Sequence, residues 1–185
     1  EARGLDYSAQ YRLDFDNGSA LDIRLLASKA LEQTILVGTA RNERNLAGMV
    51  GGGGFLPDYT PAPEWTANLI VGYSRGAFAV TTQGHYISES LLDKVTPFIG
   101  PDDPRYNPGL VNSIIDNTVS SHFTQNVNVA YDFELRGGQQ AQLWMNVNNI
   151  WDEDPPYSQG STGGANGAYY DILGRAYRLG VGSPF

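Results

Sequence analysis

Cysteine is absent from the 185 residues, and so is any long apolar run. Without a thiol the chain has no disulfide framework, no thiolate nucleophile and no cysteine-ligated zinc. No stretch reaches the roughly 18 apolar residues of a transmembrane helix, which excludes that way of crossing a membrane. The opening residues, EARGLDYSAQ, lack a basic segment followed by an apolar one, so we expect a mature chain or a fragment rather than a precursor.

Positive charge is also scarce. Twelve Lys and Arg face 20 Asp and Glu, which gives a net charge of −8 and a pI of about 4.6. This balance argues against a protein that binds the phosphates of nucleic acids. Charged residues make up 17% of the chain, below the roughly 25% of soluble domains.

Motifs for catalysis or metal binding are missing as well. The chain has no GxSxG elbow, and the glycines at 51–54 are not followed by the lysine of a phosphate-binding loop. The two histidines, His85 and His122, lack the spacing of metal ligands. The acidic run 152–154 matches no calcium loop. We therefore predict no catalytic residue, no metal and no cofactor.

What the sequence contains in quantity is alternation of apolar and polar residues. HFTQNVNVAYDFEL (122–135) alternates without a break, and so does QAQLWMNVNNIW (140–151) after a glycine-containing turn. A period of two is the pattern of a β-strand with two different faces. Seven segments have this period in all, and they are 4–15, 20–30, 64–74, 77–90, 122–135, 140–151 and 174–185.

The connections between these segments alternate in length. Short turns are expected at 16–18, 75–76 and 136–138, and long connections at 31–63, 91–121 and 152–173. Bacterial outer-membrane barrels have this arrangement, with short periplasmic turns and long external loops. We therefore predict an all-β, antiparallel transmembrane β-barrel whose apolar side chains face lipid and whose polar side chains face a wet interior.

Seven strands do not complete such a barrel, because bacterial single-chain barrels have an even number of strands. An open sheet in lipid would leave two edges of unpaired backbone groups, each costing several kcal/mol. We therefore expect residues 1–185 to be the C-terminal portion of the barrel domain of a larger protein.

Two motifs near the end of the chain resemble the TonB-dependent outer-membrane receptor family. LWMNVNNIWDEDPPYS (143–158) is similar to that family's strand ending in asparagines, an aromatic, an acidic residue and proline. YYDILGRAYRLGVGSPF (169–185) is similar to its tyrosine-aspartate, glycine-arginine and terminal phenylalanine. The sequence departs from the family at Ser183-Pro184, where alternating residues are usual, and proline removes a hydrogen-bond donor from the strand.

The resemblance implies a 22-stranded barrel in the bacterial outer membrane, closed by an N-terminal plug domain. Such receptors import a scarce ligand (a ferric siderophore, cobalamin or a carbohydrate) with energy from the TonB complex. The plug and the TonB box lie outside this chain. The implied partners are therefore the rest of the barrel, the plug, TonB, outer-membrane lipid and a small-molecule ligand, and the expected function is transport, not enzymatic catalysis.

Candidate site residues follow from this expectation. Aromatic and a few polar residues in the long connections and near the outer rim are predicted to contact the ligand; they are Tyr59, His85, Arg105, Tyr106, Trp144, Trp151 and Tyr157. Aromatic residues near strand ends are predicted to anchor the barrel at the lipid–water interface; they are Trp65, Tyr73, Phe78, Tyr177 and Phe185.

Two other functions remain compatible with the same pattern. A smaller structural or adhesive outer-membrane barrel would have the same strands but no plug. A soluble barrel that holds a ligand inside, as lipocalins do, would turn its apolar face inward. The sequence does not identify the ligand, the oligomeric state or the loops that close over a ligand.

Overall fold

The computed structural model describes residues 1–37, 42–51, 61–94, 98–110, 112–157 and 164–182. Within these ranges the chain is all-β, as predicted, and no helix is long and apolar enough to cross a membrane. One antiparallel sheet follows the order β1-β2-β4-β5-β8-β9-β10. Its strands are β1 (Ala2–Asp14), β2 (Ser19–Val37), β4 (Trp65–Arg75), β5 (Phe78–Ile87), β8 (His122–Glu134), β9 (Gln140–Asn148) and β10 (Ala176–Gly182).

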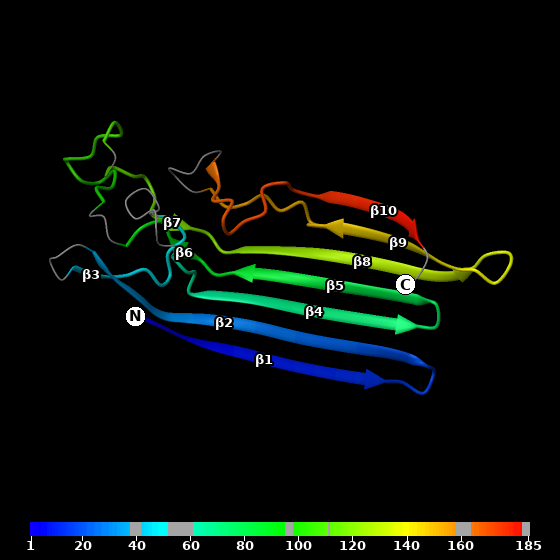
Figure 1. Cartoon of the computed structure of the whole chain (residues 1–185). Helices are drawn as coiled ribbons and strands as arrows, with labels where there is room; N and C mark the ends of the chain where they lie inside the picture. Colours follow the sequence, from blue (N-terminus) through cyan, green and yellow to red (C-terminus); the bar gives the residue numbers. More distant parts are fainter. Residues whose placement is uncertain (38–41, 52–60, 95–97, 111, 158–163, 183–185) are drawn as a thin grey trace.

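Consecutive strands of this sheet are neighbours in space, and the sheet is open (Figure 1). The three short hairpins lie at one end of the strands and the three long connections lie at the other (Figure 1). The predicted alternation of short and long connections is therefore confirmed. The remaining strands are short and belong to the long connections: β3 (Asn42–Asn45) pairs with β2, and β6 (Ser90–Leu91) pairs with β7 (Thr118–Val119).

The hairpins form where the sequence provides residues that tolerate positive φ. Gly18 has φ of 76° after Asp16-Asn17, and the Asn17 side chain accepts a hydrogen bond from the Ser19 amide at 3.0 Å. Gly76 has φ of 56° in the tight turn between β4 and β5. Because glycine has no Cβ, it adopts these angles without strain, and each turn fixes the register of the two strands it joins.

The register places most of the apolar residues of the seven strands on one face, with Leu26, Ile70 and Trp144 among the exceptions on the other. Directly opposite residues of antiparallel strands point to the same side of a sheet, and one row of such pairs runs Tyr11–Ile23–Val71–Thr82–Val127–Val147–Tyr177. The next row on this face runs Leu13–Leu21–Tyr73–Val80–Val129–Met145–Leu179. We call this side the apolar face, and the opposite side the polar face.

The apolar face carries no charged side chain except near its two borders. Lys29 lies at the border with the long connections, where its Nζ is 5.0 Å from the centre of the Trp65 ring and 3.5 Å from the Glu64 carboxylate. Arg75 lies at the hairpin border, paired with Phe78. A long cationic side chain at such a border can cover apolar surface with its stem while its charge stays in water.

Aromatic residues also mark both borders of the apolar face. In three strands, two aromatic residues on this face lie eight positions apart, and Tyr7 of β1 has the same spacing to Phe15, which directly follows that strand; the three pairs are Trp65 and Tyr73, Phe78 and Tyr86, and Phe123 and Tyr131. Eight residues of strand span about 27 Å. At a strand tilt of about 40° this becomes roughly 20 Å along a membrane normal, close to the apolar band of outer-membrane barrels.

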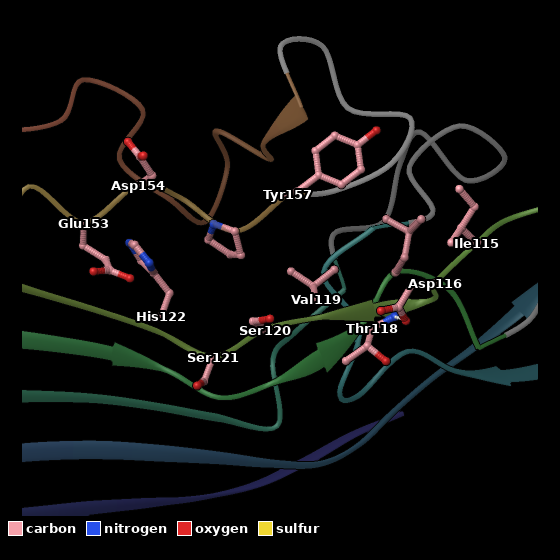
Figure 2. A pocket seen from close by; sticks show the side chains of 12 residues that line it. Ile115, Asp116, Thr118, Val119, Ser120, Ser121, His122, Glu153, Asp154 and Tyr157 are labelled. Carbon is pink, nitrogen blue, oxygen red and sulfur yellow. Dashed lines mark hydrogen bonds between the residues drawn. The ribbon is translucent and has the colours of Figure 1, made fainter.

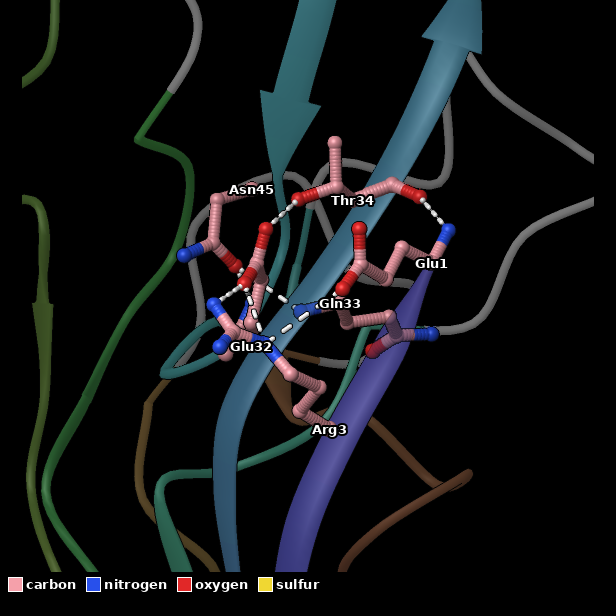
Figure 3. A network of polar contacts seen from close by, with 7 residues as sticks. Glu1, Arg3, Glu32, Gln33, Thr34 and Asn45 are labelled. Atoms are coloured by element: carbon pink, nitrogen blue, oxygen red, sulfur yellow. Dashed lines mark hydrogen bonds and ion pairs between the residues drawn. The ribbon is translucent and has the colours of Figure 1, made fainter.

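A polar network joins β1 and β2 at the end that bears the long connections (Figure 3). The Arg3 guanidinium donates from Nε to Glu32 at 2.8 Å and pairs with the same carboxylate through a second nitrogen. Glu32 also accepts a hydrogen bond from the Thr34 hydroxyl at 2.7 Å. The register shifts by one residue between Arg3 and Gly4, so this network lies beside a β-bulge.

The three long connections pack on one another and contain the core of the molecule. Val50, Ile87, Val119 and Tyr170 form one buried cluster, and Ile35, Leu46 and Met49 form a second. The side-chain amide of Asn166 donates to the Val50 carbonyl, and the Tyr169 hydroxyl donates to the Pro61 carbonyl. We call this assembly the loop layer: the described residues of 31–64, 88–121 and 149–175, together with Ile87.

Several predicted strand limits differ from the structure, and the ends of β2 and β9 have identifiable causes. β2 continues past residue 30 to Val37 because Ile35 packs into the loop layer and β3 pairs with the extension. β9 ends at Asn148 rather than at residue 151, because Asn149 and Asp152 adopt φ of 50° and 57° and turn the chain.

Candidate ligand-binding site

The polar face of the sheet leads directly to the loop layer. Its central strands present asparagine, glutamine and threonine, as in the row Ile70–Gln83–Asn126. Arg12 lies opposite Asp22 in the register of β1 and β2, and Gln142 on β9 donates to Asp132 on β8 at 2.8 Å. Polar groups thus cover this face from the hairpins to the loop layer.

Both histidines lie on the polar face near the loop layer. The His85 ring is within 3.0 Å, through Nδ1, of the Asn68 side-chain oxygen on the neighbouring strand. His122 begins β8 opposite Ile87 and is 4% exposed. Its ring meets the edge of Tyr170 with centroids 5.4 Å apart, and its buried Nε2 has no hydrogen-bond partner in the described part of the structure.

A turn at 149–153 fixes the acidic residues that follow β9. The Asn149 side chain, 2% exposed, accepts from the Glu153 amide at 3.0 Å and donates to the Glu153 carbonyl at 2.9 Å. Its own amide donates to the Asn126 side chain at 2.9 Å. Glu153 is therefore held close to the end of β8, where His122 lies.

The same turn is bound to the start of β10. The Asp152 carboxylate accepts from the Arg175 backbone amide and from its guanidinium, each at 3.0 Å. Gly174, directly before Arg175, has φ of 67°. The acidic segment after β9 and the glycine-arginine pair before β10 thus form one contact.

An open cavity of about 520 Å³ lies between these segments (Figure 2). Cavities of about 300–1,000 Å³ are the usual size of small-molecule sites. His122, Glu153 and Asp154 gather at one end, Ile115, Asp116 and Thr118 at the other, and Tyr157 projects over the middle (Figure 2). The rest of the lining comes from Leu92, Val119, Ser120, Ser121 and Pro156.

The cavity is acidic. Asp116, Glu153 and Asp154 line it, and no lysine or arginine does. Among the described residues none of these three carboxylates forms an ion pair, whereas Asp103 pairs with Arg105 at 2.8 Å elsewhere in the loop layer. The hydrogen bonds from Arg105 lower the pKa of Asp103 to about 2, so that carboxylate is already neutralised by a partner.

Beside the cavity, two tyrosines are held as neutral phenols. Burial raises the pKa of Tyr169 to about 12, and repulsion from a Tyr170 phenolate acts in the same direction. Burial likewise raises the pKa of Tyr170 to about 12. The Tyr170 ring packs against His122 in a T-shaped contact, and its buried hydroxyl has no partner among the described residues.

The predicted ligand residues are dispersed. Of the six that the structure describes, Tyr157 alone lines the cavity, and Tyr59 lies outside the described residues. His85 is near the rim on the polar face, and Arg105 and Tyr106 follow the turn begun by Asp103. Their role in ligand binding stays a prediction.

The two predicted tryptophans lie on opposite faces of the sheet. Trp144 is on the polar face and covers Gly180, where an added Cβ would lie 2.5 Å from the indole. Trp151 is 65% exposed and donates from its indole nitrogen to Gln125, a residue of the apolar face, at 2.9 Å. Gln125 in turn donates to Thr82, so the polar groups here bond to one another.

Four of the five predicted interface aromatics are described by the structure, and these four share the apolar face. Trp65 stacks on Tyr7 with ring centroids 5.9 Å apart at the border with the loop layer. Tyr73 and Phe78 lie near the hairpin border, and Tyr177 lies at the start of β10. Phe185 lies outside the described residues. Contact of these rings with lipid stays a prediction.

Sequence reasoning did not select His122, Asp116, Glu153 or Asp154 as ligand contacts. The signal was available in part, because His122 shares the polar phase of its strand and stands at the end that precedes a long connection. The proximity of Glu153 depends on the turn at Asn149, which alternation alone does not predict.

Comparison with protein-family models, with curated proteins and with solved structures finds no match for this chain. In the described part of the chain, no group of three or more histidine, aspartate or glutamate side chains is arranged to hold a metal ion. The function of the acidic cavity is therefore argued from the residues that line it.

Proposed function

We propose that this chain is the C-terminal part of the barrel of a TonB-dependent outer-membrane receptor, which imports a scarce ligand across the bacterial outer membrane. The polar face would line the wet interior beside the plug domain, and the loop layer would meet the ligand outside the cell. The rest of the barrel would pair with the edges of the sheet. TonB would act through the N-terminal part of the protein.

The single observation that supports this most strongly is the apolar face. It continues across seven strands without an interior charge, and no second layer covers it in the described structure. Soluble monomers rarely expose apolar patches larger than a few hundred Å². Lipid tails provide such a surface with an apolar solvent, and aromatic residues at both borders suit the two interfaces of a membrane.

The contact between the two family-like motifs supports the choice of family. Asp152 belongs to the first motif and Arg175 to the second, and they bond through both backbone and side chain. Asn149, the last asparagine of the first motif, holds the turn that brings them together. Residues of the two motifs that carry the resemblance thus bond the turn after β9 to the start of β10.

Spin labelling tests the membrane part of the proposal. The chain has no native cysteine, so each single-cysteine variant carries one label. In lipid vesicles, labels at Val129, Leu143 and Leu179 should collide with oxygen, which concentrates in the bilayer. Labels at the matched polar-face positions Asn128 and Gln142 should collide with a water-soluble nickel chelate instead.

The opposite pattern of collisions would contradict the proposal and favour a soluble barrel with an apolar interior. The import role needs a separate test, because a structural or adhesive barrel would give the same labelling. An upstream plug domain and TonB box in the same gene, and ligand uptake that stops in a TonB-deficient strain, are the expected results. A gene that encodes a barrel without a plug would overturn the import role.

A further inference from the structure

We propose that the cavity of the loop layer binds an organic cation bearing protonated amines and hydroxyl groups. This inference rests on the proposed function only for the side of the membrane from which the ligand arrives. It goes further by naming the ligand's chemistry from the groups that line the cavity.

The unpaired carboxylates are the first reason. Asp116, Glu153 and Asp154 line the cavity, and in the described structure no lysine or arginine pairs with any of them. Carboxylates accept but do not donate hydrogen bonds, so their best partner is a positively charged donor. A ligand that brought further negative charge would be repelled by all three.

The second and independent reason is His122. Its side chain lines the cavity while the residue as a whole is 4% exposed, and its Nε2 has no hydrogen-bond partner among the described residues. Figure 2 shows the imidazole directed from β8 towards the end of the cavity where Glu153 and Asp154 lie. A buried polar atom without a partner is costly, and a ligand donor that reached Nε2 would remove that cost.

The remaining lining defines the rest of the ligand. Ser120 and Ser121 lie between the two acidic ends, and Thr118 lies beside Asp116 (Figure 2). Tyr157, which is 73% exposed, offers a ring over the middle of the cavity, where an ammonium or a sugar ring can rest on its face. Because the acids stand at both ends, a ligand with amines at separate positions fits better than a single ammonium.

A matched pair of sugars tests the charge requirement. The glucosamine trimer and its N-acetylated counterpart share their ring skeleton and differ in charge. With the purified protein in detergent, at a pH where the amines are protonated, calorimetry should show at least tenfold tighter binding of the amine form. The preference should shrink as salt is added, because salt screens the attraction between charges.

Variants locate that preference in the cavity. Glu153→Gln and Asp154→Asn should each weaken binding of the amine trimer at least threefold, and the double variant, which keeps only Asp116 of the three acids, should lose most of the preference for the amine trimer. His122→Phe, which keeps an aromatic ring against Tyr170, should weaken binding further, whereas His122→Gln should restore part of it. Asp102 is an exposed acid outside the cavity, in the connection that carries Asp116. The control variant is Asp102→Asn, which should not change binding of either trimer.

Equal affinity for the two trimers would overturn the inference, as would unchanged binding in the double variant. Absence of binding by both the amine trimer and spermidine would overturn it as well. The spin-label pattern of the same preparations separates this failure from failure of the proposed function. If the apolar-face labels still report lipid, the barrel assignment stands and only the ligand chemistry is wrong.

Discussion

The sheet and the loop layer treat their apolar residues in opposite ways. Of the ten buried apolar residues in the described part of the chain, nine lie in the loop layer, and Ala141 is the exception in the sheet. Large apolar residues of the sheet such as Leu143, Tyr177 and Leu179 are 42%, 66% and 71% exposed. The loop layer therefore has a small buried core, although Ile115 and Leu173 on its surface are 75% and 83% exposed, whereas the described sheet outside it buries only Ala141 among its apolar residues.

This difference has a physical reason. A single layer of strands can bury neither of its faces, whereas three long connections that meet at one end can bury a small core between them. The sheet needs a second apolar phase against its apolar face, and we infer that lipid supplies it. The chain's two methionines, Met49 in the loop layer and Met145 in the sheet, allow the two regions to be compared with the same chemistry.

The largest expected effect is the loss of Met49. Met49 is 2% exposed, and Met49→Ala should destabilise the loop layer by about 2–5 kcal/mol through the cavity it leaves. Met145→Ala, at a position 42% exposed, should change stability by no more than about 0.5 kcal/mol. The stability change of each variant is measured by hydrogen exchange of the loop-layer amides and by denaturant unfolding in lipid vesicles. Equal losses would mean that both regions are buried in the same way.

A charge on the apolar face gives the next largest effect. Val127 lies midway between Phe123 and Tyr131 on β8, and Val127→Arg should cost about 2–4 kcal/mol in a bilayer, the value for arginine at the midplane of a barrel. Asn128→Arg adds the same side chain one residue away on the polar face and should cost far less. The measurement is refolding from urea into vesicles. Similar costs for both variants would refute the assignment of faces.

Removing the Asn149 side chain tests how the loop layer is joined to the sheet. Asn149→Ala leaves the amide and carbonyl of Glu153 without their partner and puts alanine at a φ of 50°, so we expect a loss of about 1–3 kcal/mol. Asn128→Ala, an exposed asparagine of β8, is the matched control. Thermolysin cleavage after β9 should become faster in the first variant alone.

How much was visible in the sequence differs between the two regions. Alternation predicted the long strands of the sheet and the face of each residue because register follows from period and turn length, as at Gly18 and Gly76. The loop layer could not be predicted in this way. Its contacts, such as Asn166 with Val50 or Tyr169 with Pro61, join residues over 100 positions apart and have no periodic signal.

The candidate site shows the same limit. Tyr157 was predicted from residue type alone, but His122 and Glu153 come together only because Asn149 turns the chain back over β8. Asparagine and aspartate adopt a positive φ more readily than most residues, and such a residue turns the chain out of the strand. The alternation of the strand does not predict where this turn occurs. The acidic run 152–154 was therefore visible in the sequence, whereas its proximity to His122 was not.

The smallest expected effect concerns one hydroxyl group of the loop layer. Tyr169→Phe removes the hydrogen bond to the Pro61 carbonyl and should cost about 1 kcal/mol at neutral pH. Tyr157→Phe, at an exposed position, is the control and should be neutral. Hydrogen exchange of the loop-layer amides measures both, and a neutral Tyr169→Phe would mean that this contact contributes nothing.

The same variant alters the response to alkali. Because burial raises the pKa of Tyr169 from 10.0 to about 12, the unfolded chain releases the phenol proton first as pH rises. The stability of the loop layer is therefore fully present below pH about 10 and is lost as pH rises towards about 12, through Tyr169 and Tyr170 together. Tyr169→Phe leaves one such group, so its loss of stability should be shallower, and an unchanged slope would contradict the burial of this phenol.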